Sequence, residues 1–339
     1  GDVYKRQVLT ARTNYLLAIA DLLAYAKGPI EIPIYLADSI MVETRTTLTG
    51  VSYAIRTYVD IFELPKTIVD RGTLGKLLET VDKYVRLRYK LADFLEVARK
   101  ELDLSDGELK LVGALYKTFL KLEEEGRNHV WTAIIKNAFA PLTIVNSYGK
   151  FDCVIGNPPW INWESLPESY RDETKKLWDY YGLLKKTKGM GLGKIKRDMA
   201  MLFVTRCLDR YTKDDGKLSL LIPFTTYKTQ AGAGFRSYLA NKCNVSKVHD
   251  IVELFPFEGA INRTSLIVID KEGKTTFPIS CTMWHNPRGK GINQEATLDE
   301  VYKITQQYTM ILAPITRSKP EASWTVSYTH LTLPTNREV

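Results

Sequence analysis

The feature that most constrains the fold is an apolar run, residues 151–156, that leads directly into Asn157, Pro158, Pro159 and Trp160. Short apolar runs bounded by turn signals are typical of buried strands. Asn-Pro-Pro alone is usually a turn, since neither proline can donate a backbone hydrogen bond. Directly after a strand, this turn would lie at the carboxyl end of a sheet, where open α/β folds bind their ligands.

The side chains of this motif suit reaction at a planar amine. An aromatic amino nitrogen is a poor nucleophile, because its lone pair is delocalised into the ring. Two fixed acceptors can hold its N–H groups and draw the nitrogen toward tetrahedral geometry. The side-chain oxygen of Asn157 and the main-chain carbonyl of Pro158 are such acceptors, and Pro159 restricts Pro158 to an extended conformation. Trp160 would lie against the face of the aromatic ring that carries the amine. The motif therefore predicts methylation of an amino group.

The hydrophobic pattern elsewhere predicts an interrupted α/β sheet. Before the motif we expect a helix over 8–25, a strand over 32–37, a β-hairpin or extended excursion over 46–63, and a helical lobe over 67–138 that is interrupted at 103–107. After the motif we expect a helix over 200–211, a strand over 217–224 and an antiparallel pair of strands over 245–254 and 264–270.

These features resemble the N6-adenine DNA methyltransferases of the large type IIG restriction-modification kind, which carry Asn-Pro-Pro-aromatic on the fourth strand of the sheet. The resemblance runs from about Val8 to Trp324 and is carried by residues 8–17, 34–39, 129–141 and the motif. It implies a truncated Rossmann-like sheet with a helical insertion, S-adenosylmethionine as methyl donor, and double-stranded DNA with a flipped adenine as substrate. It further implies a restriction-modification or phage-defence system, with a possible nuclease domain or subunit.

The resemblance also implies roles for residues outside the motif. Asp38, with Ser39 beside it, matches the acidic position that binds the cofactor's adenine amino group, and Asn157 completes the expected cofactor contacts. Asp38 could instead cap the segment that follows it. Phe255 or Phe257 matches an aromatic that packs on the face of the base opposite Trp160, although either ring could equally belong to the core.

A basic stretch lies between Asp179 and Asp198 and contains no acidic residue. Its cationic side chains are Lys185, Lys186, Lys188, Lys194, Lys196 and Arg197. Its glycines suggest a phosphate-binding loop, but they follow lysines rather than an apolar strand, so we reject that interpretation. We expect a mobile loop that neutralises DNA phosphates; the alternative is a surface loop without function.

The sequence predicts a division into several parts. We expect the methyltransferase core over 8–61 and 141–276, a helical insertion over 62–140, and the start of a target-recognition region over 277–325. The expected strand, glycine-rich cofactor loop and second strand do not precede Val8. Residues 1–7 and 326–339 resemble translated sequencing adapters, so we exclude both from fold reasoning and interpret the chain as an internal fragment.

Composition agrees with an intracellular enzyme that acts on a polyanion. The chain has 339 residues, 45% of them hydrophobic, and a formal net charge of +8. Its four cysteines are too dispersed to suggest a zinc site or a disulfide framework, and we expect no metal. No apolar run approaches the ~20 residues of a membrane span, so a cytoplasmic location is expected.

Two alternatives to DNA methylation remain open. The same motif can serve a protein glutamine side chain or a guanine amino group in ribosomal RNA, because each is a planar NH2. A non-catalytic DNA-recognition subunit is the other alternative, although the intact motif and Asp38 argue against it. The preferred mechanism is extrusion of an adenine followed by direct methyl transfer, without a covalent enzyme intermediate.

Overall fold

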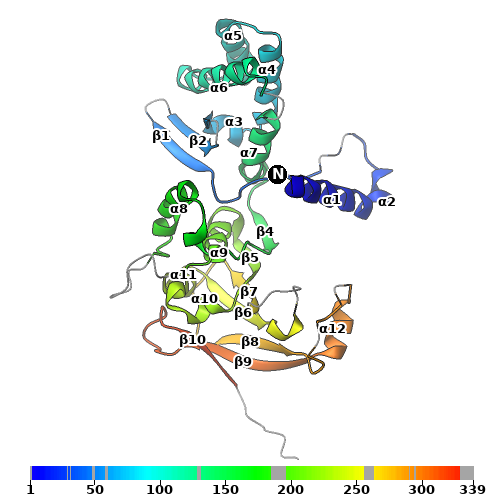
Figure 1. Cartoon of the computed structure of the whole chain (residues 1–339), viewed down its shortest axis with the longest axis vertical. Helices are drawn as coiled ribbons and strands as arrows, with labels where there is room; N and C mark the ends of the chain where they lie inside the picture. The colour runs from blue at the N-terminus through cyan, green and yellow to red at the C-terminus, as the bar shows by residue number, and fades with distance from the viewer. Residues whose placement is uncertain are drawn as a thin grey trace, which may run out of the picture. The chain divides into compact units, whose positions relative to one another are not determined.

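A computed structural model describes residues 2–28, 30, 32–47, 50–57, 60–127, 131–184, 196–255, 263–289, 291–293 and 295–328. The chain divides into two compact units, residues 1–149 and 150–339 (Figure 1). No helix within the described ranges is both long and apolar enough to cross a membrane.

The first unit contains a small antiparallel sheet and a set of helices. The helices are α1 (Asp2–Ala18), α2 (Ala20–Leu23), α3 (Lys66–Asp70), α4 (Leu74–Arg86), α5 (Leu91–Leu102), α6 (Asp106–Glu124) and α7 (Trp131–Tyr148). The strands β1 (Glu43–Thr47), β2 (Gly50–Arg56) and β3 (Ile61–Pro65) pair in that order, all antiparallel. The predicted helix, hairpin and helical lobe are thus present.

One hydrophobic core joins this sheet to the helices that follow it. Leu77, Val81 and Val85 of α4 recur at helical spacing and are buried, as expected of a helix with one apolar face. Phe62 of β3 belongs to the same cluster and stacks on Trp131 of α7, with ring centroids 5.3 Å apart. The division predicted between residues 61 and 62 therefore cuts through a core that the hairpin and helices share.

The strand predicted over 32–37 is wrong. In the described part of this segment no residue belongs to a strand, and the main-chain carbonyl of Ile34 instead accepts a hydrogen bond from Nε of Arg12 at 3.0 Å. Apolar residues become a strand only when a neighbouring strand pairs with their backbone groups. The described three-stranded sheet does not include this segment.

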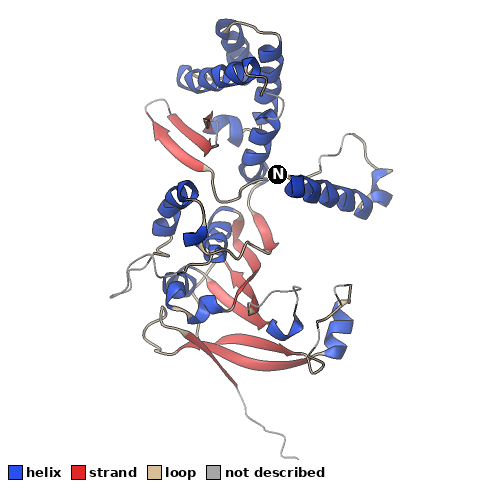
Figure 2. Ribbon diagram, viewed as in Figure 1, coloured by secondary structure: helices blue, strands red, loops and turns tan. Residues whose placement is uncertain are grey.

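The second unit is built on a mixed sheet of seven strands (Figure 2). Its strands are β4 (Phe151–Gly156), β5 (Thr212–Pro223), β6 (Asn244–Asp250), β7 (Thr264–Asp270), β8 (Ile279–His285), β9 (Gln306–Pro314) and β10 (Trp324–Tyr328), in the order β10-β9-β8-β6-β7-β5-β4. Its α-helices are α8 (Glu168–Tyr180), α9 (Met199–Arg210), α10 (Thr225–Lys228), α11 (Ala233–Lys242) and α12 (Leu298–Ile304). The α/β class is confirmed.

The directions of the strands determine which strand ends lie on the same edge of the sheet. β4 is parallel to β5, β6 is parallel to β8, and β7 runs antiparallel to both β5 and β6. The carboxyl ends of β4, β5, β6 and β8 therefore lie on one edge of the sheet, which we call the carboxyl edge. The predicted strand after the motif and the predicted antiparallel pair are confirmed.

Burial differs along this sheet. Leu218, Leu220 and Ile222 of β5 are buried at alternate positions, and α9 packs on this strand. β4 is the edge strand, and its Ile155 is 76% exposed. The strand that carries the motif is thus held by backbone pairing with β5 more than by burial of its own side chains.

The segments that we excluded or separated also have regular structure. Residues 277–325, predicted to begin another region, contribute β8, α12 and β9 to the same unit and sheet. Val326 of the excluded end pairs with Leu312 of β9, and α1 begins at Asp2. The core of the second unit therefore extends beyond the predicted boundary at residue 276.

Candidate active site

Asn157 directly follows β4 at the carboxyl edge. Its side chain is exposed and has no hydrogen-bond partner among the described residues. An amide carries an acceptor oxygen and two N–H donors. Asn157 therefore offers an unengaged acceptor at the edge where α/β sheets bind ligands.

The next three residues are held against the sheet. Pro158 is buried and Pro159 is exposed. Trp160 is half-buried, and its indole Nε1–H donates to the carbonyl of Leu221 on β5 at 3.1 Å. This bond fixes the Trp160 ring to the strand beside β4, so the motif is attached to the sheet on both sides of its prolines.

The chain after the motif is joined to the start of α9. Asn162 forms an isolated β-bridge with Asp198, and the N–H of Met199 donates to the carbonyl of Ile161 at 2.9 Å. Glu164 accepts from Nη1 of Arg197 at 3.0 Å and from the main-chain N–H of Arg197 at 2.9 Å. The far end of the basic stretch thus lies beside the residues that follow Trp160.

This geometry corrects one predicted DNA contact. Arg197 is 2% exposed and its guanidinium pairs with Glu164, so it is not available to a phosphate. Lys196, its neighbour, is exposed. Lys185, Lys186, Lys188 and Lys194 lie outside the described residues.

Asp198 caps α9 and has a perturbed acidity. Its Oδ1 accepts from the N–H of Ala200 at 2.8 Å, which satisfies one of the unpaired donors of the first helical turn. Burial raises the pKa of Asp198 from 3.8 to about 6, and the bond from Ala200 opposes this rise. The sequence does not reveal this effect, because it depends on the packing around the segment after the motif.

Asp38 and Ser39 belong to the first unit, whereas the motif belongs to the second. Oδ1 of Asp38 accepts from the N–H of Ile40 at 2.8 Å, which is the capping contact given as the alternative. The Asp38 carboxylate is exposed, and a carboxylate can accept from several donors. Its role toward a cofactor stays a prediction.

Phe255 lies in the loop after β6. It follows the 3-10 helix η5 (Val252–Leu254), has φ 47° and ψ 56°, and is 50% exposed. Of the two predicted stacking aromatics it is the one that the structure describes, since Phe257 lies outside the described residues. Phe255 is thus partly accessible at the carboxyl edge.

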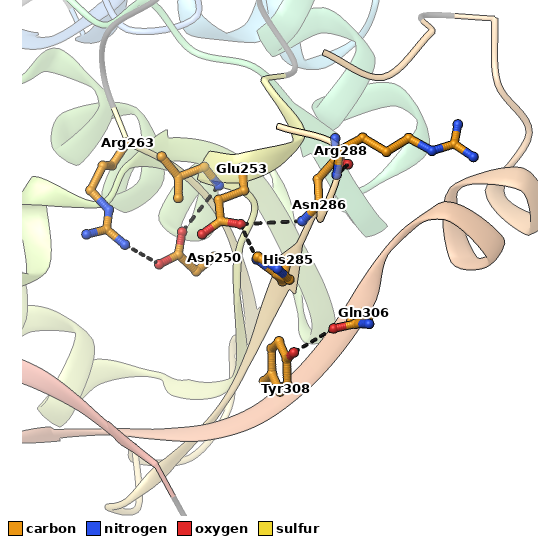
Figure 3. Close-up of polar contacts among 9 residues, drawn as sticks. Asp250, Glu253, Arg263, His285, Asn286, Arg288, Gln306 and Tyr308 are labelled. Atoms are coloured by element: carbon orange, nitrogen blue, oxygen red, sulfur yellow. Dashed lines mark hydrogen bonds and ion pairs between the residues drawn. The ribbon is translucent and has the colours of Figure 1, made fainter. Parts of the chain in front are cut away.

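Sequence reasoning missed a polar cluster at the same edge (Figure 3). It contains Asp250, Glu253, Arg263, His285 and Asn286, which come from the ends of β6, β7 and β8. Asp250 and His285 are each the last residue of a strand, and that position is the signal that could have found them.

The residues present suit part of S-adenosylmethionine. The exposed Asp38 carboxylate has the chemistry to accept from an adenine amino group, and Asn157 offers an amide at the ligand-binding edge. The described residues do not include a glycine-rich strand-to-helix turn of the kind that holds the other parts of such a cofactor. The contacts predicted for Asp38 and Ser39 in the first unit and for Asn157 in the second stay predictions.

Several solved structures are similar to this chain at low identity. A type I restriction-modification methyltransferase subunit from Streptococcus thermophilus has TM-score 0.31 and 19% identity, over 46% of this chain and 31% of that one. The type ISP restriction-modification enzyme LlaGI, in complex with a DNA substrate mimic, has TM-score 0.34 and 14% identity, over 75% and 23%. The type IIL enzyme MmeI, in complex with DNA, has TM-score 0.32 and 10% identity, over 51% and 21%.

This chain spans about a third or less of the length of these three proteins. Among curated proteins, no sequence is similar enough to count as a match. The family model described as Eco57I restriction-modification methylase matches residues 57–257, which is more than half of the chain and includes the motif and β5. The chain therefore belongs to the Eco57I restriction-modification methylase family.

Proposed function

We propose that the whole protein of which this chain is a part methylates the N6 amino group of adenine in DNA. The observation that carries this proposal is the exposed, unengaged side chain of Asn157 at the end of β4, followed by Pro158 and Pro159. Membership of a restriction-modification methylase family supports DNA as the substrate.

The two acceptors of the motif act on the amine. Oδ1 of Asn157 and the carbonyl of Pro158 each accept one N–H of the adenine amino group, which turns its lone pair out of conjugation with the ring. S-adenosylmethionine, when bound, supplies the methyl group, whose bond to sulfur breaks with its electron pair as the new bond to nitrogen forms. The methylated amine then releases a proton to water, so the residues of this chain need not act as a base.

The adenine must leave the duplex to reach these acceptors, at a cost of a few kcal/mol. Trp160 supplies one stacking surface and Phe255 the other, with Phe257 as the alternative to Phe255. Lys196 and the lysines at 185, 186, 188 and 194 neutralise DNA phosphates. Asp38 and Ser39 contact the adenine end of the cofactor.

Membership of a restriction-modification methylase family also supports a proposal about the wider system. We propose a site-specific enzyme of the type IIG kind, in a restriction-modification or phage-defence system, that works in the cytoplasm. A nuclease domain or subunit would act on DNA that lacks the methyl group. Methylation of protein glutamine or ribosomal RNA guanine, and a non-catalytic recognition role, are the competing functions.

The test is the identity of the methylated product. The whole protein is incubated with radiolabelled S-adenosylmethionine and, in separate reactions, with unmethylated genomic DNA, ribosomal RNA or a protein extract. The DNA is then digested to nucleosides. We expect label in N6-methyldeoxyadenosine. Label in RNA or protein alone would replace the proposal, and no transfer with DNA binding retained would favour the non-catalytic subunit.

A further inference from the structure

The loop after β6 is fixed at its start by a buried carboxylate. Oδ2 of Asp250 pairs with Nη2 of Arg263 at 2.9 Å, and Oδ1 accepts from the N–H of Val252 at 3.3 Å. The Asp250 side chain is 5% exposed, whereas that of Arg263 is half-exposed. This pair therefore ties the end of β6 to the residue that precedes β7 (Figure 3).

A second carboxylate fixes the middle of the loop. Oε2 of Glu253 lies 2.5 Å from Nδ1 of His285, the last residue of β8, and also accepts from the N–H of Asn286 at 3.4 Å. A carboxylate only accepts, so the imidazole nitrogen donates. Because β8 is the parallel neighbour of β6, this contact anchors η5 to the adjacent strand.

Phe255, directly after this anchored turn, has an unusual backbone conformation. Of the three described non-glycine residues with positive φ, it is the aromatic one; the other two are Arg88 and Asp103. A left-handed conformation is costly for a bulky residue and persists only where the surrounding structure imposes it. Such residues concentrate at functional sites.

The anchored turn and the motif share one edge of the sheet. β6 is separated from β4 by β7 and β5, so their ends lie roughly 14 Å apart, given about 4.8 Å between neighbouring strands. Trp160 is bound to β5, between them. Two aromatic side chains with a planar base between them can span a gap of this size.

We propose that Glu253 and His285 are positioning residues that hold Phe255 in its exposed, left-handed conformation for stacking on the extruded base. This inference rests on the proposed function. Glu253 and His285 do not touch the base; they act through Phe255. Their loss therefore lowers methylation only as far as it misplaces that ring.

A double-mutant cycle tests this coupling in the whole protein. The variants are His285→Ala, Phe255→Ala and the combination, assayed for kcat/KM of methyl transfer. We expect each single change to lower kcat/KM roughly ten- to hundredfold, as misplacement of a substrate-contacting group does, and the combination to be no worse than Phe255→Ala. Losses that multiply in the double variant would overturn the inference, because His285 would then act independently of Phe255.

A fluorescence readout separates positioning from general damage. 2-Aminopurine is placed at the target adenine, once sequencing of methylated DNA has mapped that site, and its emission rises when the base leaves the stack. We expect a reduced rise for His285→Ala and for Glu253→Gln. A rise equal to that of the unmodified protein would contradict the proposal.

Conservative variants provide the controls. His285→Asn keeps an N–H donor near the place of Nδ1 and should restore most of the signal. Tyr308→Phe removes the hydroxyl that bonds Gln306 at 2.6 Å but keeps the ring beside His285, and should behave as the unmodified protein. If the unmodified protein does not methylate adenine, the proposed function fails as well; if it does and these variants do not differ, only this inference fails.

Discussion

The loop after β4 and the loop after β6 end on the same edge of one sheet, but they use their polar groups differently. After β4, Asn157 is unengaged, and the ion pair that fixes the chain comes seven residues later, between Glu164 and the buried Arg197. At the end of β6 and directly after it, Asp250 pairs with Arg263 and Glu253 pairs with His285. The accessible side chain there is aromatic, Phe255.

The comparison separates groups that hold the backbone from groups that can meet a ligand. In each loop, paired polar groups attach the chain to a neighbouring segment. The accessible side chains include one with a clear ligand chemistry, Asn157 in the first loop and Phe255 in the second. An amide in the first loop suits hydrogen bonding to an amine, and a phenyl ring in the second suits stacking. Variants of each kind of group test whether holding the backbone and facing the ligand are separable.

The largest effect on stability should come from the ion pair of the first loop. Glu164→Gln leaves the buried Arg197 guanidinium without a charge partner, so we expect the free energy of unfolding to fall by about 3 kcal/mol. Glu253→Gln should cost less than about 1 kcal/mol, because Glu253 and His285 are each about one-third exposed. Urea denaturation measures both, with the exposed Glu168→Gln as control. Equal losses would remove the difference between the loops.

The next largest effect should come from loss of the Trp160 ring, and it should lower activity. Stacking on a base is worth about 1–3 kcal/mol, so Trp160→Ala should lower kcat/KM roughly ten- to hundredfold. Trp160→Phe keeps a ring and loses the indole N–H that donates to Leu221, a bond worth about 1 kcal/mol. Steady-state kinetics distinguish the two variants. Similar losses would mean that Trp160 holds the loop and does not face the base.

A smaller, pH-dependent effect is expected at Asp198. Its pKa is raised from 3.8 to about 6 in the folded protein, so the folded state binds the proton more tightly and stability falls as pH rises between these values. Asp198→Asn cannot ionise and can still cap α9. Above pH 6 we expect this variant to be more stable than the unmodified protein by about 1 kcal/mol, since solvent weakens the effect of a partly exposed group. Below pH 4 the two proteins should be equally stable. Thermal unfolding across this range would contradict the account if the difference did not vary.

The smallest effect should appear in the salt dependence of DNA binding. Lys196→Gln removes one exposed charge and should reduce the slope of log affinity against log salt concentration by about one. Arg197→Lys keeps a charge that is already buried against Glu164, so its slope should not change. Binding titrations at several salt concentrations compare these adjacent residues. A change in slope for Arg197→Lys would show that Arg197 contacts a DNA phosphate.

Local sequence was sufficient for the elements that carry their own signal. The apolar runs of β4, β5 and β7 end at residues that break a strand, and α4 repeats its buried residues at helical spacing. The segment 32–37 has a similar apolar character and forms no strand. A strand needs a neighbouring strand to pair with, and the hydrophobic periodicity of a segment does not show whether that neighbour exists.

The contacts that local sequence could not give are long-range. Arg197 belongs to a run of cations that indicates a surface, and its burial depends on Glu164, 33 positions earlier. Glu253 meets His285, 32 positions later, only because β8 pairs beside β6. Asn157 could be predicted as a candidate catalytic residue from local sequence, because the motif to which it belongs consists of four consecutive residues.

The most direct test of the account is the effect of changing Asn157 on methyl transfer and on DNA affinity, measured together in the whole protein. We expect Asn157→Ala to lower kcat by at least about a hundredfold, as loss of a preorganised polar group at the reacting atom does, and to leave the DNA dissociation constant nearly unchanged. Asn157→Asp, which keeps an acceptor oxygen, should retain more activity than Asn157→Ala. Equal loss of methylation and of DNA affinity, or full activity of Asn157→Ala, would contradict the assignment of Asn157 to the reacting amine.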